Sequence, residues 1–245
     1  MARSAVRWSK VLREQIIPLE ISRGTSAQAI HAAVAQKSRL IRDSAIQQGR
    51  ASPVYLTKVD GRRNAAEETV QLAGGTITYV FSQLAQAANW ALGECRKRSP
   101  VRSGAFRKSW AVLVNEKLWN AAPATIPMGA EVWIVNTMPY ARKIEVGGQK
   151  IKVDPKIVEA VGKAVNGRFQ GVKAQRLFKP LKGGRDARGG PVPYILKGAG
   201  IASGLSWTRK GGWTRKHSSY VSERSDRQAG EQVLYPTLIL TERIT

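Results

Sequence analysis

Residues that carry out most enzyme chemistry are few in this sequence and lie far apart. The chain has one cysteine, Cys95, and two histidines, His31 and His217. A structural zinc site takes about four Cys or His ligands and a disulfide takes two cysteines, so neither can form within the chain. The sequence also lacks a P-loop, a dinucleotide fingerprint, an HExxH helix and a GxSxG elbow. We therefore predict no catalytic residue, no metal site and no cofactor.

Two sets of charged residues have the composition of a metal or nuclease site, but neither has a specific spacing. The two sets are Asp43 with Glu67 and Glu68, and Asp60 and Glu145 with Lys150. Carboxylates at this density are usually solvated surface groups. A nuclease remains the third hypothesis, and it would require metal-dependent cleavage that is lost when one carboxylate is removed.

A short repeat near the C-terminus combines aromatic and basic residues. Trp207-Thr208-Arg209-Lys210 is followed six residues later by Trp213-Thr214-Arg215-Lys216, a spacing that favours a hairpin over a solenoid. Such aromatics can stack on bases while the cations meet phosphates. In the alternative, the two tryptophans pack under the loop or against another subunit. The candidate DNA or partner contacts are Trp207, Arg209, Lys210, Trp213, Arg215 and Lys216. No helix-turn-helix, RRM or KH signature is present, so base-specific readout is not expected.

The composition indicates a folded protein with a polyanionic neighbour. The 245 residues include 40 Lys and Arg against 17 Asp and Glu, a net charge of +23, and 42% of residues are hydrophobic. That apolar fraction suffices for a core, so the charge lies on a folded surface facing nucleic acid, an acidic protein or a membrane. The simpler alternative is a surface that charge keeps soluble. No apolar run approaches the roughly 20 residues of a membrane span, and no secretory signal is evident, so we expect a soluble, cytosolic product.

Hydrophobic periodicity predicts two long helices, one or two short ones and about six strands. The helices are expected over 26–48, 82–98, 140–145 and 155–165. The strands are expected over 53–59, 76–81, 106–114, 130–135 and 233–240. In the last strand, Pro236 favours an edge position or a bulge. Cys95 falls on the apolar face of its helix, although neighbouring Arg96 and Lys97 could lower its pKa.

These elements predict an α+β fold, with a small antiparallel β-sheet or sandwich packed by two longer helices. A long basic insertion rich in Gly, Lys and Arg precedes the last strand. The expected organisation is an N-terminal arm over 1–25, a core over 26–178 plus 230–245, and the insertion or extended loop over 179–229. A loop of this length in a compact domain is usually functional or disordered.

Two spaced motifs carry a resemblance to a known family. Residues 98–109 read RSPVRSGAFRKS, and residues 135–147 read VNTMPYARKIEVG. The chain resembles the HK97 gp10-like family of tailed-bacteriophage neck and tail-completion (head–tail joining) proteins, whose patterns are P-V-x-T/S-G-x-L-x-x-S and N-x-x-P-Y-A-x-x-x-E-x-G. Residues 235–238 also resemble the closing strand of that family. Ser103 stands where Thr is commoner and Phe106 where Leu is, and the basic insertion is not a family feature.

The motif residues read as scaffold. They are Pro100, Ser103, Gly104, Phe106, Asn136, Pro139, Tyr140, Ala141, Glu145 and Gly147. Gly104 permits a tight turn, and Pro139 suits the first position of a short helix. Tyr140 and Ile144 are four residues apart and can face the core together. Glu145 can pair with a nearby Arg or Lys, and Gly147 can end the helix.

The resemblance implies a structural virion protein that forms a ring, commonly hexameric, at the neck between the head connector and the tail. Its partners would be other copies of itself, the portal or adaptor (connector) proteins, the tail terminator or tail tube, and the DNA backbone in the channel, with no membrane. It would be assembled in the host cytoplasm and reside at the head–tail interface of the virion. The alternative is a sequence-independent nucleic-acid-binding protein.

Overall fold

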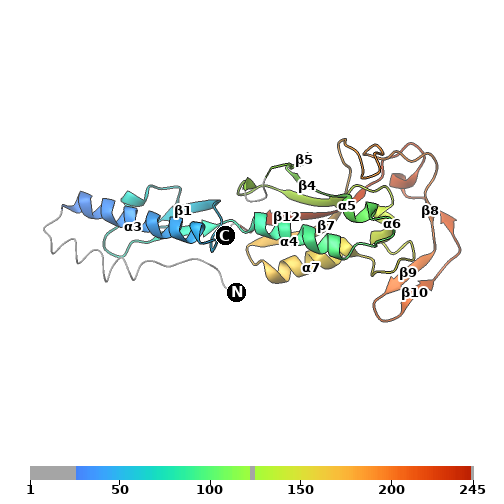
Figure 1. Cartoon of the computed structure of the whole chain (residues 1–245), viewed down its shortest axis with the longest axis horizontal. Helices are drawn as coiled ribbons and strands as arrows, with labels where there is room; N and C mark the ends of the chain where they lie inside the picture. The colour runs from blue at the N-terminus through green and yellow to red at the C-terminus, as the bar shows by residue number, and fades with distance from the viewer. Residues whose placement is uncertain (1–25, 122–124, 244–245) are drawn as a thin grey trace. The chain divides into compact units, whose positions relative to one another are not determined.

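The computed structural model describes residues 26–121 and 125–243 (Figure 1). The expected N-terminal arm over 1–25 lies outside the described residues. The chain divides into two compact units, Met1–Gln83 and Leu84–Thr245. This division cuts across the single core expected over 26–178 and 230–245, because the first long helix packs on a small sheet of its own.

The first unit is one helix on a three-stranded antiparallel sheet. Its elements are α3 (Ala27–Gln47), β1 (Tyr55–Val59), β2 (Arg62–Arg63), η2 (Glu67–Thr69) and β3 (Ile77–Phe81), with sheet order β2-β1-β3. Ser26 caps α3, because its side chain accepts a hydrogen bond from the backbone N–H of Ala29. Ile30 and Val34 of α3 pack against Val59 and Ile77 of the sheet. The predicted helix and both predicted strands of this region are confirmed.

The second unit is built on a five-stranded antiparallel sheet in the order β5-β4-β6-β12-β7. The strands are β4 (Trp110–Val114), β5 (Lys117–Leu118), β6 (Val132–Asn136), β7 (Val172–Lys179) and β12 (Tyr235–Glu242). The helices are α4 (Leu84–Lys97), α5 (Ala105–Lys108), α6 (Ala141–Glu145) and α7 (Ile157–Arg168). In Figure 1, α4 and α7 run along the sheet, and their apolar residues form one core with alternate residues of the strands. The predicted α+β class, with two helices packed on an antiparallel sheet, is confirmed.

The opposite face of the sheet is covered by the first part of the basic insertion. Leu181 and Val192 of that segment join Trp133 and Ile239 of the sheet in a second core. A stretch that reads as a Gly-rich loop therefore supplies a layer of the fold.

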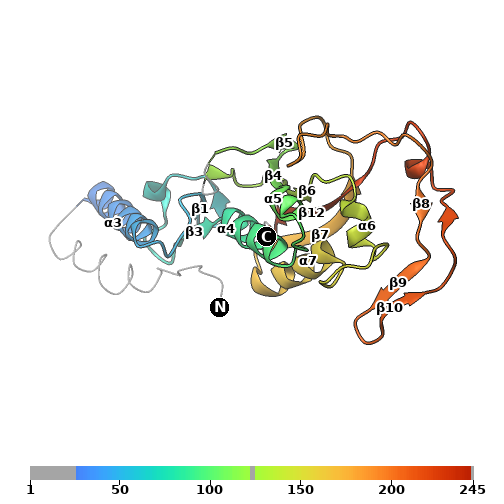
Figure 2. The same ribbon diagram turned by 45° about the vertical axis from the view of Figure 1, so that its right-hand side comes forward.

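The rest of the insertion forms a two-stranded ribbon (Figure 2). Its strands are β8 (Ile201–Ala202), β9 (Leu205–Thr208), β10 (Gly212–Arg215) and β11 (Tyr220–Val221), and η4 (Ser225–Arg227) follows. β9 pairs with β10, and β8 pairs with β11. Between these ladders the carbonyl of Gly204 accepts a hydrogen bond from the N–H of Lys216 at 2.9 Å. We call residues 201–221 the basic ribbon.

Two local predictions are wrong. The strand expected over 106–114 begins only at Trp110, because Gly104 in a left-handed conformation (φ +75°) turns the chain into α5. Pro236 lies in a central strand, not at an edge. It is tolerated there because it is the second residue of β12, and the pairing of β12 with β6 starts one residue later, at Thr237.

Candidate functional site

The two motifs that carry the resemblance meet in space, about thirty residues apart in the chain. The Asn136 side-chain amide donates to the carbonyl of Phe106 at 2.8 Å, and its oxygen accepts from the N–H of Met138 at 3.1 Å. The N–H of Thr137 donates to the carbonyl of Ser109 at 3.0 Å. Asn136 is fully buried, so its side-chain amide cannot bond to water. The two hydrogen bonds of its side chain replace those to water and offset the cost of burying a polar group. We call this set of contacts the motif junction.

Aromatic rings complete the motif junction. The Phe106 ring is stacked on Tyr140 with centroids 5.9 Å apart and meets Trp110 edge-on at 6.0 Å. An aromatic ring at position 106 is thus accommodated where the family pattern has Leu. Ile144 is buried, and Tyr140 packs against the same core, as their four-residue spacing predicts. Pro139 lies one residue before the N-cap of α6, not at its first position.

Glu145 is the most constrained charged residue of the second motif. Its carboxylate accepts the N–H of Val158 at 2.9 Å and that of Glu159 at 3.0 Å, and it pairs with Arg176 at 3.3 Å. Only 2% of the residue is exposed, and this burial raises its pKa, against the effect of the two N–H donors and of Arg176. The predicted pairing with an Arg is confirmed. The capping of α7 was missed, because Lys156 at the N-cap gives no sign that a distant side chain supplies the cap.

Gly147 joins the second motif to the basic ribbon. It ends α6 with a φ of +73°, as predicted. A Cβ at this position would lie 3.4 Å from the Cβ of Trp207 and 3.8 Å from Cζ3 of Trp213. The two tryptophans therefore lie over the end of α6. Of the other motif residues, Ala141 is buried, whereas Pro100 is half-buried and Ser103 is exposed.

The predicted Trp hairpin is confirmed, and its two faces differ. Trp207 and Trp213 are directly opposite each other, and the next pair on that face is Leu205 and Arg215. The other face carries small hydroxyl residues. They are Ser206, Thr208 and Thr214. Because the Trp face contacts α6, the structure favours packing over base stacking for the two tryptophans.

The four cations of the basic ribbon are exposed, and only Arg215 shares the Trp face. Arg209 and Lys210 form the exposed turn, and Lys216 and Arg215 are exposed along β10 and just beyond it. Arg215 donates to the carbonyl of Ser203 at 3.2 Å. Among the described residues, none of the four forms an ion pair. The ribbon therefore presents uncompensated positive charge beside a polar hydroxyl face, which suits contacts to phosphate groups.

The carboxylates of the two candidate metal and nuclease sets are engaged in other interactions. Asp43 pairs with Arg42 at 2.7 Å, while Glu67 and Glu68 share Arg39. In the described residues no group of three Cys, His, Asp or Glu could hold a metal ion. Asp60 belongs to the first unit, where it accepts the N–H groups of Gln71 and Thr76, and Glu145 belongs to the second unit.

Cys95 is a core residue, as its position on the helix predicts. It is fully buried on α4, and this burial raises the pKa of the thiol. The alternative, that Arg96 and Lys97 lower this pKa, is wrong: both side chains are exposed, and burial outweighs the one cation that lowers the pKa, Arg98.

Across the described ranges, no helix combines the length and apolarity needed to cross a bilayer. No protein-family model, curated protein or solved structure matches this chain.

Proposed function

We propose that this protein is a structural component of a tailed-phage virion that forms a ring at the neck and joins the head connector to the tail. The observation that carries the proposal is the motif junction. The two sequence motifs that resemble neck proteins interlock through Asn136, and the second of them also caps α7 through Glu145. Both motifs serve to hold one rigid unit together, as expected of a subunit whose task is to present surfaces to its neighbours.

The distribution of charge supports a place beside DNA. A net charge of +23 favours a polyanionic partner, and the basic ribbon offers Arg209, Lys210 and Lys216 without ion pairs in the described residues. In a ring around the exit channel, such side chains would hold the DNA backbone without reading sequence. The remaining partners in this proposal are further copies of the chain, the connector proteins and the tail terminator or tail tube.

A sequence-independent nucleic-acid-binding protein is the second candidate. The same exposed cations favour it, since contacts to phosphates alone give binding without sequence preference. It differs from the first proposal in what holds the complex together. Nucleic-acid binding weakens steeply with salt, whereas docking between protein surfaces depends less on ionic strength.

The two candidates are separated by measuring binding to a purified portal–connector complex and to DNA alone, from low salt up to about 0.5 M. The protein is treated with nuclease beforehand, so that no nucleic acid bridges the partners. The neck proposal predicts connector binding that persists at the highest salt concentration. Binding to DNA alone, with no connector binding at any salt concentration, would instead favour the second candidate.

A further inference from the structure

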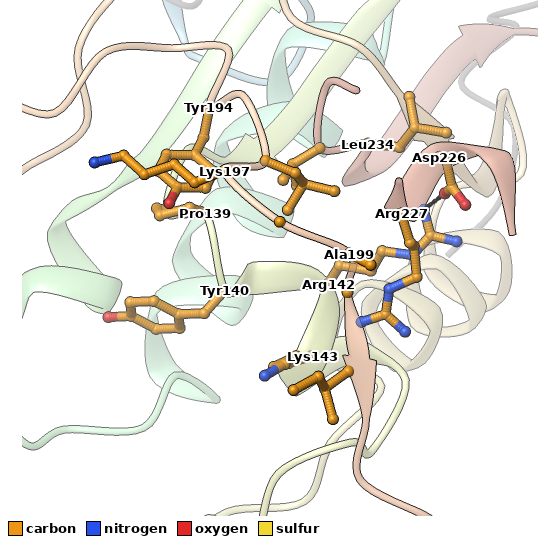
Figure 3. Close-up of a pocket in the computed structure, with 15 residues that line it drawn as sticks. Pro139, Tyr140, Arg142, Lys143, Tyr194, Lys197, Ala199, Asp226, Arg227 and Leu234 are labelled. Atoms are coloured by element: carbon orange, nitrogen blue, oxygen red, sulfur yellow. Dashed lines mark hydrogen bonds and ion pairs between the residues drawn. The ribbon is translucent and has the colours of Figure 1, made fainter. Parts of the chain in front are cut away.

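A pocket of about 450 Å³ lies between α6 and the two chain segments that flank the basic ribbon (Figure 3). Residues of α6 and the turn before it form one side, and residues 194–201 and 226–234 form the others. The pocket is separate from the Trp face of the basic ribbon: Ile201, the first residue of the ribbon, lines the pocket, whereas Leu205, Trp207, Trp213 and Arg215 do not. Its volume is in the range of sites that hold small ligands or a few residues of a peptide.

Buried charge forms one wall of this pocket. Arg142 is only 7% exposed, pairs with Asp226 and has its guanidinium carbon 4.4 Å from the centroid of the Phe178 ring. Asp226 is shared, because Arg224 also contacts the same carboxylate at 3.1 Å. A single carboxylate thus serves two guanidinium groups, which leaves this wall positive.

Three further cations line the pocket without a partner. Lys143 comes from α6, Lys197 from the segment before the basic ribbon and Arg227 from η4 (Figure 3). Among the described residues, none of these three side chains forms an ion pair. The lining therefore holds four cations and one carboxylate, and mutual repulsion in a partly enclosed space favours binding of an anion.

The remaining walls are apolar or offer free backbone groups. Leu196 and Ile201 line the pocket, and Ile201 is 57% exposed, so its apolar surface is open to a ligand. The N–H groups of Gly198 and Ala199 have no hydrogen-bond partner in the described part of the chain. A Cβ at Gly198 would meet nothing within 4 Å, so the backbone is open to a ligand.

This combination fits an acidic peptide better than a nucleotide. A nucleotide needs a free aromatic face for its base. The Tyr140 ring is stacked on Phe106, and the guanidinium carbon of Arg188 lies 5.7 Å from its centroid. The other tyrosine that lines the pocket, Tyr194, packs against the second core.

We infer that this pocket binds an extended acidic segment of a partner protein. A ligand carboxylate would meet Lys143 and Arg227, an adjacent apolar side chain would contact Leu196 and Ile201, and the ligand backbone would accept from the N–H of Gly198. The inference concerns a site apart from the Trp face and holds under either proposed function.

The test is fluorescence anisotropy with the full chain and a labelled eight-residue peptide that alternates Glu and Leu. Matched peptides that alternate Gln and Leu, or Lys and Leu, are the controls. The structure predicts that the Glu peptide binds at least about tenfold more tightly than either control at physiological salt. Failure of the Glu peptide to bind, or equal binding of the Gln peptide, would overturn the inference.

Variants locate the binding. The pair Lys143→Glu with Arg227→Glu should weaken Glu-peptide binding at least about tenfold. The matched pair Arg209→Glu with Lys210→Glu changes the net charge equally at the turn of the basic ribbon and should leave binding nearly unchanged. If both pairs weaken peptide binding equally, the peptide responds to the overall positive charge, and the inferred pocket site is wrong. Displacement of the peptide by a short DNA duplex would also contradict the inferred site. Lys143→Gln with Arg227→Gln repeats the test without charge reversal in case the first pair does not fold.

Discussion

At the scale of single residues, the structure depends strongly on Glu145. Its carboxylate satisfies two backbone N–H groups at the start of α7 and an arginine from β7, all within the core of the second unit. A buried carboxylate is costly to leave unpaired, and here every oxygen has a partner. Removing this side chain leaves Arg176 without one of its carboxylates and α7 without its cap.

We predict that Glu145→Ala lowers the free energy of unfolding by about 3 kcal/mol, combining the loss of a helix cap with that of a buried ion pair. Glu145→Gln keeps an acceptor oxygen and should lie between Glu145→Ala and the unchanged protein. The matched control is Glu116→Ala, which removes an exposed partner of Lys182 and should change the free energy of unfolding little, because solvent screens an exposed ion pair. Urea denaturation followed by circular dichroism gives these values, and a similar cost for both alanine variants would show that the cap is unimportant.

Cys95 provides a second test at this scale. Because burial raises the pKa of its thiol, we predict no labelling by a thiol reagent in the folded protein and complete labelling in denaturant. The unfolded thiol ionises near its ordinary pKa of 9.0, whereas the folded thiol stays protonated, so the free energy of unfolding should fall as pH rises above 9.0. Cys95→Ala removes this part of the pH dependence. Stoichiometric labelling of the native protein within minutes would contradict the burial.

At the scale of elements, the basic ribbon is held by its Trp face. Gly147 lies under Trp207 and Trp213, so the ribbon is attached to α6 by packing, and its cations remain outside. Two-stranded ribbons are only marginally stable alone, which makes this contact necessary for an ordered hairpin.

We predict that Trp207→Ala frees the basic ribbon without unfolding the second unit. Trypsin should then cut after Arg209 or Lys210 several times faster, while the thermal unfolding midpoint changes little. Ser206→Ala alters a neighbouring position on the opposite face and serves as the control. Unchanged cleavage in Trp207→Ala would mean that the tryptophans do not hold the ribbon.

Local pattern explains which elements the sequence predicts. The helices over 26–48 and 82–98 have regular apolar spacing, and Ser26 supplies a cap, so α3 and α4 could be found. The start of β4 could not be predicted, because it depends on the left-handed backbone conformation of Gly104. The cap that Glu145 provides reaches the N–H of Val158, 13 residues further along the chain, and no local rule links the two.

The layer that covers the second face of the five-stranded sheet could not be predicted from the sequence pattern either. Leu181 and Val192 are isolated apolar residues among Gly, Pro, Lys and Arg, and nothing in their spacing marks a core. They become a layer only because β7 and β12 place them over Trp133. Of the candidate site, the hairpin and the scaffold role of the second motif could be predicted, whereas the side on which the tryptophans pack could not.

At the scale of the whole molecule, charge is the dominant property. The net charge of +23 is distributed over two units, and many carboxylates in each are already paired with arginines. The cations left over are therefore available to a polyanion.

We predict that neutralising the basic ribbon lowers the salt dependence of duplex DNA binding. The variant changes four residues to Gln: Arg209, Lys210, Arg215 and Lys216. If each contacts one phosphate, the slope of log K against log salt, which is negative, should become shallower by about 3.6. The control changes four exposed cations of the first unit to Gln: Lys37, Arg50, Arg62 and Arg63. Equal slopes for the two variants would show that DNA binding depends on the overall charge of the molecule and not on the basic ribbon.

The central claim, that this chain is a ring-forming neck protein, is tested most directly by electron microscopy of the nuclease-treated protein. Imaging at about 0.5 M salt suppresses weak electrostatic clustering, so that association through protein surfaces is what remains. The account predicts closed rings with a central channel, either from the protein alone or on the purified connector complex. Particles that remain single chains in both samples would contradict it.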